Sequence, residues 1–226
     1  MRYIYLLIVL CCFSCNNERT LFLPEIKNTE ITEVLDVSPA YLFYDETQPD
    51  SILLNRKNLI STTNWLVNVD KRLTLEQAIP KIILMQNKKR NAKMHKNEAA
   101  KNYFTCNATS INTLGFIEFT NVYFISESSE RLDSEKQTNE IILDIKSLND
   151  ISLFNSKSKS STIKKSNLDQ LVNVIHLLAE SEGFTSATLR LNLKKSLTFQ
   201  EYISVKSKLL ELSSKNITVN KNEFIY

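Results

Sequence analysis

The sequence predicts an α+β protein with two small related modules of the type β-β-α-β-α-β, each a mixed sheet with helices on one face. Three observations predict this class. Short segments of alternating polarity, typical of strands, are separated by longer segments with apolar residues at helical spacing. A strand-turn-helix pattern occurs once in each half of the chain. Between the two copies lies a Ser- and charge-rich stretch without periodicity, which indicates a linker.

The chain is long enough for two domains. Its 226 residues exceed a typical single domain of roughly 100 to 150 residues even after a leader is removed. We expect a signal peptide at 1–14, a tether at 15–38, a first, degenerate module at 39–125, a linker at 126–139 and a second module at 140–226.

The first module is expected to contain a hairpin, a further strand, one helix and a last, longer strand. The expected ranges are 41–44 and 51–55 for the hairpin, 65–69 for the third strand, 75–86 for the helix and 116–124 for the last strand. Pro80 lies inside the helical pattern and is expected to kink the helix or to shift its start.

The second module shows clearer periodicity. Its expected strands are 140–145, 151–154, 187–193, 216–219 and 223–226, and its expected helices are 168–180 and 199–212. A Ser- and Lys-rich loop at 155–165 separates the first two strands from the first helix. The resulting order is β-β-α-β-α-β.

The repeated pattern consists of Leu66–Ile79 and Arg190–Ile203. In each copy a Thr opens the helix, and Gln77 or Glu201 follows three residues later, which is the pattern of a capping box. Duplication of one small domain explains the repeat, and independent selection of residues that favour a capped helix is the alternative. Five aligned pairs are identical: Asn68/Asn192, Lys71/Lys195, Leu73/Leu197, Thr74/Thr198 and Ile79/Ile203.

This strand-turn-capped-helix-strand unit, preceded by a hairpin and a first helix, resembles the periplasmic domain of the ExbD/TolR family. The resemblance covers 140–226 best and 41–124 in part, since 56–63 stands where the second copy has a full helix. It implies an envelope protein that dimerises and is linked to energy transduction or to peptidoglycan. The family's transmembrane helix carries a proton-handling aspartate, and residues 1–15 contain none, so proton conduction is not implied.

The first fifteen residues are typical of a bacterial lipoprotein signal. Arg2 precedes an apolar run from Tyr3 to Phe13, and Ser14-Cys15 closes it. The run is shorter than the roughly 20 residues that cross a bilayer, which favours a removable leader. We expect lipidation at Cys15 and attachment to the membrane through acyl chains. An ordinary secretory signal and a short uncleaved anchor are the alternatives.

The leader also predicts where the protein works. Cys15 is followed by Asn16 and not by the Asp that often retains lipoproteins in the inner membrane, so we expect the outer membrane of the cell envelope, on either face. The C-x-x-C spelling of Cys12 and Cys15 lies in an apolar leader and does not indicate redox chemistry. Cys106 is the one other cysteine after the leader, so no internal disulfide is expected.

Composition excludes several function classes. Hydrophobic residues make up 42% of the chain and the formal net charge is +3, which suits folded cores and does not indicate a nucleic-acid partner. Gly115 and Gly183 are the two glycines and lie far apart, whereas phosphate-binding loops need several close together. We expect no cofactor.

One basic run is a candidate binding surface. Six positive charges in this run would suit anionic lipid headgroups, lipopolysaccharide phosphates or an acidic protein. The alternative is a solvated helix end, where lysines complement the helix dipole. The residues are Lys88, Lys89, Arg90, Lys93, Lys96 and Lys101.

No catalytic or metal site is expected. The histidines are His95 and His176, whereas a zinc site needs three or four converging ligands. Cys106 with His95 is the one Cys/His pair close in sequence. We expect a non-enzymatic binding or assembly component whose partners are envelope proteins at exposed sheet edges, a second copy, or peptidoglycan. A hydrolase of envelope polymers and a lipoprotein that binds an uncharacterised ligand are the alternatives.

Overall fold

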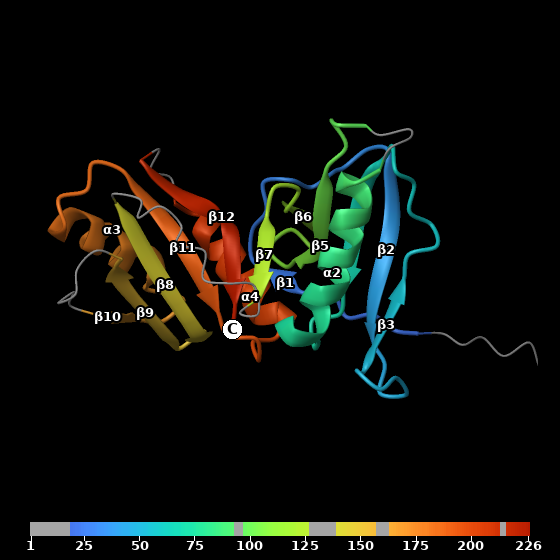
Figure 1. The fold of residues 1–226 in the computed structure, drawn as a ribbon, viewed down its shortest axis with the longest axis horizontal. Coiled ribbons are helices and arrows are strands. Elements are labelled where there is room, and N and C mark those ends of the chain that lie inside the picture. Colours follow the sequence, from blue (N-terminus) through green and yellow to red (C-terminus); the bar gives the residue numbers. More distant parts are fainter. Residues whose placement is uncertain (1–18, 93–96, 127–138, 157–162, 213–215) are drawn as a thin grey trace, which may run out of the picture.

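The computed structural model describes residues 19–92, 97–126, 139–156, 163–212 and 216–226. In these residues it has two mixed sheets of six strands each and three helices, α2 (Leu75–Arg90), α3 (Leu171–Ser181) and α4 (Phe199–Leu210). Figure 1 shows the first sheet at one end of the molecule, the second sheet and α3 at the other, and α4 near the middle. The predicted α+β class with two sheet modules is confirmed.

Six short strands form the first sheet: β1 (Glu25–Ile26), β2 (Val37–Tyr44), β3 (Ile52–Asn55), β4 (Asn64–Val69), β5 (Asn102–Ala108) and β6 (Thr113–Glu118). Their order is β1-β5-β4-β2-β3, and β6 pairs with β5 as well. The contacts β2–β4, β4–β5 and β1–β5 are parallel, whereas β2–β3 and β5–β6 are antiparallel.

The second sheet consists of β7 (Tyr123–Ser126), β8 (Glu140–Ser147), β9 (Asp150–Asn155), β10 (Lys164–Ser166), β11 (Ala187–Leu193) and β12 (Ile217–Ile225). Their order is β10-β9-β8-β11-β12-β7. The contacts β8–β11, β11–β12 and β12–β7 are parallel, and β8–β9 and β9–β10 are antiparallel.

The two sheets share one topology. Strands β3-β2-β4-β5 and β9-β8-β11-β12 have the same order and the same directions, an antiparallel hairpin followed by two parallel strands. A capped helix links the last two strands in each, α2 in the first module and α4 in the second. Helix α3 has its counterpart in the turns of 56–63, as the degenerate first copy predicted.

Strand β7 corrects the expected module boundary. Residues up to 125 were assigned to the first module, with one strand over 116–124. Instead the chain turns between Phe119 and Val122, where the Val122 N–H donates to the Phe119 carbonyl at 3.1 Å, and β7 then pairs with β12 of the second sheet. The alternation of polar and apolar residues continues across this turn. The sequence pattern therefore does not reveal that β6 and β7 belong to different sheets.

Strand β5 was absent from the sequence prediction, although it is an interior strand of the first sheet that pairs with β1, β4 and β6. Six of its seven residues are buried, Asn107 being the exception. A strand that is buried on both faces loses the alternation of polar and apolar residues by which a half-buried strand is recognised.

The segment expected as a tether packs on the folded body. Residues 22–30, here called the N-terminal strap, include β1, and Ile26 is buried. The strap crosses so close to β6 that a Cβ on Gly115 would lie 2.9 Å from Thr29 Cβ. Two residues of strand are too few to give a periodic signal, so the sequence reads as a linker.

The helices begin close to the expected residues. Helix α2 starts at Leu75 as expected, continues through Pro80 and extends beyond the expected end to Arg90. Helix α3 ends in a Schellman motif: Gly183 has φ +67°, and the Phe184 N–H donates to the Ala179 carbonyl at 2.9 Å. The two expected strands at 216–219 and 223–226 form the single strand β12.

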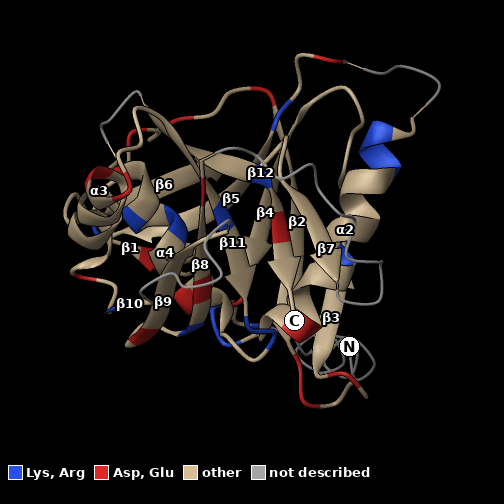
Figure 2. Cartoon of the chain, turned by 60° about the vertical axis from the view of Figure 1, so that its left-hand side comes forward, with Lys and Arg blue, Asp and Glu red and all other residues tan. Residues whose placement is uncertain are grey.

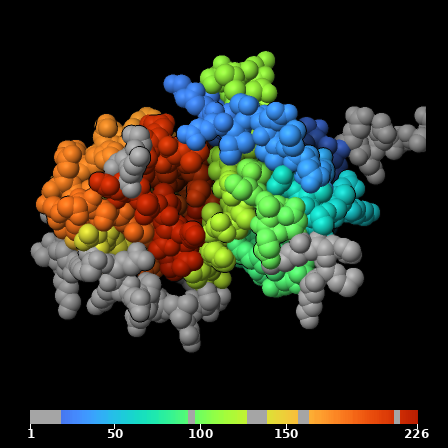
Figure 3. All heavy atoms as spheres, turned by 90° about the horizontal axis from the view of Figure 1, so that it is seen from above, coloured from blue at the N-terminus to red at the C-terminus, as the bar shows by residue number. Residues whose placement is uncertain are grey.

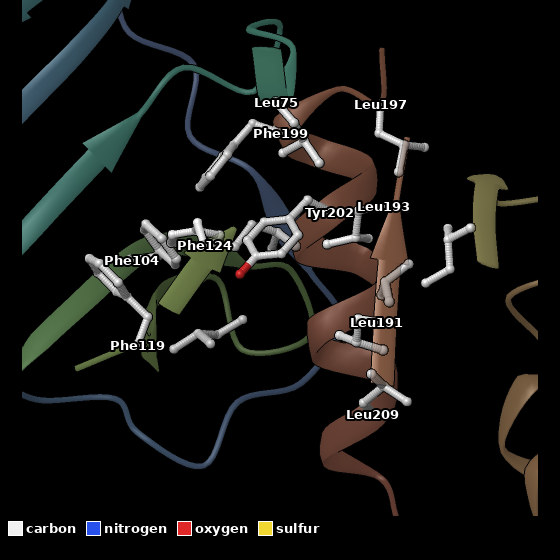
Figure 4. Close-up of a cluster of buried hydrophobic side chains, with 14 of the residues drawn as sticks. Leu75, Phe104, Phe119, Phe124, Leu191, Leu193, Leu197, Phe199, Tyr202 and Leu209 are labelled. Atoms are coloured by element: carbon white, nitrogen blue, oxygen red, sulfur yellow. The ribbon is translucent and has the colours of Figure 1, made fainter. Parts of the chain in front are cut away.

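One hydrophobic core extends through both modules. Phe104 and Phe119 of the first module stack with ring centroids 3.7 Å apart. Phe199 and Tyr202 of α4 meet the Phe104 ring edge-on, at 5.1 Å and 6.2 Å. Figure 4 shows these aromatic side chains between the strands of the first module and α4. The modules therefore fold as one packed body.

Candidate functional site

The two modules meet at the starts of α2 and α4. Thr74 and Thr198, the N-caps of the two helices, face each other in an antiparallel β-bridge. We call residues 71–76 and 195–200 the module junction. Figure 4 shows Leu75 and Phe199 together at this end of the core.

Four backbone hydrogen bonds hold the module junction, and they form two related pairs. The Leu75 N–H donates to the Leu197 carbonyl at 2.8 Å, and the Phe199 N–H donates to the Leu73 carbonyl at 2.6 Å. Because Leu73 aligns with Leu197 and Leu75 with Phe199 in the repeat, each bond is the counterpart of the other. The two copies are thus related by a local pseudo-twofold axis that passes between the threonines.

The second pair of bonds obeys the same relation. The Glu76 N–H donates to the Lys195 carbonyl at 2.9 Å, and the Gln200 N–H donates to the Lys71 carbonyl at 3.2 Å. The first N–H groups of a helix have no partner within the helix. In this protein the first two of each helix bind the opposite module, and the third binds its own Thr cap, so the junction satisfies donors that would otherwise need water.

A buried polar cluster lies beside the junction. The Tyr202 hydroxyl donates to Glu223 Oε2 at 2.9 Å, and Lys206 Nζ donates to Glu223 Oε1 at 2.5 Å. Glu223 is fully buried and Lys206 nearly so. Burial, and then the adjacent carboxylate, raise the pKa of Tyr202 well above its ordinary value, so its hydroxyl stays a donor. The cluster ties α4 to β12.

The N-terminal strap lies along α4. The Gln200 side-chain amide forms two hydrogen bonds with the strap backbone. Its Oε1 accepts from the Glu25 N–H at 2.8 Å, and its Nε2 donates to the Glu25 carbonyl at 2.9 Å. Lys71 Nζ lies 2.6 Å from the Glu25 carboxylate. Further along, 27–30 and Ser207 line the same small hollow on α4. Figure 3 shows the strap, in blue, against the red C-terminal part of the molecule.

An arginine clamp fixes the start of the strap. The Arg72 guanidinium lies 4.7 Å from the ring centroids of both Phe22 and Tyr44, and it binds both oxygens of Asp70, at 2.8 Å and 2.9 Å. Burial favours a raised pKa for Asp70, but hydrogen bonds from Arg72 and from the Phe22 backbone outweigh it and lower the pKa. Asp70 is therefore charged in the folded protein at neutral pH.

Among the described residues, an apolar groove lies along α2 next to the module junction. We call it the α2 groove. Its volume is about 440 Å³. On its rim Lys195 Nζ lies 3.6 Å from Glu76 Oε1, and more than half of each side chain is exposed. The lining residues are Leu75, Glu76, Ile79, Pro80, Ile83, Ser126, Lys195, Ile225 and Tyr226.

Two residues of the predicted basic surface are committed to the fold. Lys89 is buried, and its ammonium donates to the Thr63 carbonyl, the Lys101 carbonyl and Asn102 Oδ1 at 2.9–3.1 Å. Burial lowers the pKa of Lys89 to about 8. Arg90 donates to the Thr120 and Val122 carbonyls. Neither side chain is free to bind an anion, because the last turn of α2 packs against the body.

The other residues of the basic run do not complete a surface in the described part of the chain. Lys88 is exposed at the end of α2, where Figure 2 shows basic residues gathered. Lys101 donates to Glu118 at 2.8 Å, which neutralises its charge locally. Lys93 and Lys96 lie outside the described residues.

The cysteine considered as a nucleophile is a core residue. Cys106 is fully buried in β5, and burial raises the pKa of its thiol to about 12, whereas a nucleophilic cysteine needs a lowered pKa. His95 and Cys15 lie outside the described residues, and His176 is half-buried on α3. Among the described residues, no group of three or more His, Cys, Asp or Glu side chains converges as metal ligands would.

Comparisons with protein-family models, with curated proteins and with solved structures found no match to this chain. No helix in the described ranges is both long and apolar enough to cross a membrane.

The strap and the α2 groove were missed by sequence reasoning, although one signal for the groove was present. When the two copies are aligned, Pro80 and Ile83 of α2 stand opposite Ser204 and Ser207 of α4. The corresponding faces of the two helices therefore differ in polarity. The strap has no such signal, because its contacts are with residues far away in the sequence.

Proposed function

We propose that this chain is a lipid-anchored protein of the cell envelope that acts as a non-enzymatic binding or assembly component. In this proposal acyl chains on Cys15 hold the body at a membrane leaflet, in the outer membrane by preference. The sequence Ser14-Cys15 after a short apolar run supports the anchor. The resemblance of the sequence to the ExbD/TolR periplasmic domain supports a link to energy transduction or to peptidoglycan.

The observation that carries the proposal is the module junction. It joins two sheets into one body in which β3 ends the first sheet and β10 ends the second. An edge strand presents backbone N–H and C=O groups to which another chain can add. A packed body in which β3 and β10 are edge strands among the described residues suits a component that holds partner proteins in a fixed arrangement.

A hydrolase of envelope polymers is the alternative from another functional class. Its candidate nucleophile, the Cys106 thiol, is poorly suited to attack a substrate. Cys106 is buried in β5, where it pairs with Gly115 of β6, and its raised pKa keeps it protonated at neutral pH. Binding is therefore the function that the geometry supports better.

The anchor is tested by Cys15→Ser with Cys12→Ser as the matched control. If Cys15 is lipidated, Cys15→Ser moves the protein from the membrane fraction to the soluble fraction, and Cys12→Ser stays in the membrane fraction. Equal behaviour of the two variants would contradict the proposed lipid anchor.

The binding role is tested by chemical cross-linking in intact cells, purification of the full chain and identification of its partners by mass spectrometry. We expect cross-links from residues of β3 or β10 to a second protein, or retention of the full chain on isolated sacculi if peptidoglycan is a partner. A chain that is cross-linked to nothing and is not retained would contradict the binding role.

A further inference from the structure

The stretch of chain between the expected anchor and the folded body is short. Arg19 is the first described residue, and its guanidinium lies 3.7 Å from the Asp45 carboxylate in the turn after β2. The chain is held again at Phe22, whose N–H donates to the Asp70 carboxylate and whose carbonyl accepts from the Lys71 N–H. These contacts fix the chain to the body only a few residues after Cys15.

Covalent geometry limits how far the anchor lies from this point. The four residues from Cys15 to Arg19 span at most about 14 Å when fully extended. If Cys15 carries acyl chains, the leaflet that holds them therefore lies close to the end of β2. Figure 1 shows β2 and β3 at the end of the molecule opposite α3, so the first module is the one beside the membrane.

One face of the sheet at this end is apolar and aromatic. Alternate residues of β2 from Ser38 to Leu42 are buried, so the residues between them point to the opposite face of the sheet. On β3, Leu53 pairs with Phe43 and shares that face. Each side chain of this face is at least partly exposed. We call the face the outer face, and its residues are Val37, Pro39, Tyr41, Phe43 and Leu53.

The second module has charged residues at two of the corresponding positions. Because β2 pairs with β4 in the register in which β8 pairs with β11, Tyr41 corresponds to Asp144 and Phe43 to Lys146. A sheet face that meets water ordinarily carries polar residues, as β8 does at these positions. The outer face departs from this pattern, and an exposed apolar face indicates an interaction surface.

The chemistry of the outer face suits the surface of a lipid leaflet. The rings of Tyr41 and Phe43 stack with their centroids 5.8 Å apart. Aromatic side chains favour the headgroup level of a bilayer, where the ring is apolar and a tyrosine hydroxyl still meets water. Phe43 precedes Asp45 by two residues, which is about 7 Å along a strand. The outer face and the point where Arg19 is bound therefore lie at the same corner of the body.

Building on the proposed function, we propose that the outer face rests on the phospholipid leaflet that holds the acyl chains of Cys15. The acyl chains supply the attachment, and the outer face fixes the orientation of the body. The first sheet then lies against the lipid, and the second module points away from it. Strand β10, which Figure 1 shows at the far end of the molecule, is placed on the side away from the leaflet.

Fluorescence quenching in vesicles tests this orientation. The full chain is purified from membranes and reconstituted in vesicles of phosphatidylethanolamine and phosphatidylglycerol that contain a lipid with a nitroxide headgroup. A bimane label is attached to Leu53→Cys on the outer face or to Leu177→Cys, a change of an exposed leucine on α3. Cys106 is buried and its thiol has a raised pKa, so it does not compete for the label.

The label at position 53 should lose most of its fluorescence, and the label at position 177 should keep most of it. Because Leu53→Cys alters the sheet itself, Thr47→Cys in the exposed turn after β2 provides a second label at the same corner, with the same expected loss. Equal quenching at 47, 53 and 177 in a chain that stays on the vesicles would overturn the proposed orientation.

A spacer separates the contribution of the outer face from that of the short tether. With a Gly/Ser spacer of about 20 residues inserted between residues 18 and 19, the outer face should still hold the body on the lipid, so the label at position 47 stays quenched. Phe43→Lys, which gives β2 the charge of Lys146, should abolish this quenching in the spacer chain, and Leu177→Lys should not. Loss of quenching in the spacer chain without a substitution would overturn the outer face as a lipid-binding surface.

Two further measurements separate this proposal from its alternatives. If purified Cys15→Ser forms dimers that Phe43→Lys abolishes, the outer face binds a second copy, and the lipid assignment is overturned. Membrane fractionation of Cys15→Ser tests the anchor by itself. A chain that does not stay on the vesicles would overturn the anchor together with the orientation, whereas a chain that stays without quenching at position 53 would overturn the orientation alone.

Discussion

Thr74 and Thr198 face each other across the one isolated β-bridge of the described residues, and each also caps its own helix. The Thr74 hydroxyl accepts from the Gln77 N–H, and the Thr198 hydroxyl accepts from the Glu201 N–H. A sequence feature that begins a helix therefore also sets the position at which the two modules meet.

We expect Thr74→Ala and Thr198→Ala each to lower the free energy of unfolding by about 1 kcal/mol, because each removes an N-cap. Urea denaturation measures the loss. Thr218→Ala, on the exposed part of β12, is the control and should change stability by less than about 0.5 kcal/mol. If the two N-caps did not contribute to stability, all three variants would have the same free energy of unfolding as the wild type, which would contradict the prediction.

The buried Lys206–Glu223 pair predicts a strongly non-additive response. Lys206→Met leaves a fully buried carboxylate with Tyr202 as its remaining partner, and should cost about 3 to 5 kcal/mol. Adding Glu223→Gln removes the uncompensated charge, so the double variant should be more stable than Lys206→Met alone. A double-mutant cycle by urea denaturation measures this coupling, and simple additivity of the two losses would contradict it.

Lys89 predicts a rise in stability at alkaline pH. Its pKa is about 8 in the folded protein and near the ordinary value of 10.5 when unfolded. Between these values the unfolded state binds the extra proton, so the free energy of unfolding rises with pH, by at most about 1.4 kcal/mol per pH unit.

The difference in stability between the wild type and Lys89→Met isolates this effect from the other lysines and tyrosines. Below about pH 8 the ammonium is charged in both states, so the difference should be constant there and should then grow in favour of the wild type as the pH rises. A difference that stays flat up to pH 10 would show that Lys89 titrates normally in the folded protein.

Gly115→Ala should loosen the N-terminal strap, because the added Cβ would lie 2.9 Å from Thr29 Cβ and 3.0 Å from Ile26 Cδ1. Limited proteolysis should then cleave within residues 22–30 faster than in the wild type. Gly183→Ala is the control: it strains a φ of +67° at the end of α3 but meets no atoms within 4 Å, so the strap should keep its protection. Equal cleavage of the two variants would contradict the proposed close contact at Gly115.

Local patterns predicted the helices and strands that make the two copies alike. The capping boxes at Thr74 and Thr198 are formed, and β11 has its expected bounds. These features depend on residues within a few positions of one another, so their physics is present in a short stretch of sequence.

The features that distinguish the copies depend on distant contacts and were not predictable. Glu25 meets Gln200 across 175 positions, and β7 leaves the first module to pair with β12. Lys89 belonged to a basic run that suited a charged surface, yet the carbonyl groups that receive its ammonium lie at Thr63 and Lys101, on segments that only the fold brings near. The expected anionic surface was therefore wrong at this residue.

The pairing of the two modules is tested most directly by hydrogen exchange of four amides, those of Leu75, Glu76, Phe199 and Gln200. Amides in the first turn of a helix ordinarily lack a protein partner and exchange rapidly. In this protein each donates to the opposite module, so all four should exchange as slowly as Val67 and Leu191 in the central strands. Rapid exchange of the four, with Val67 and Leu191 still protected, would show two modules that are not joined at the threonines and would contradict the account.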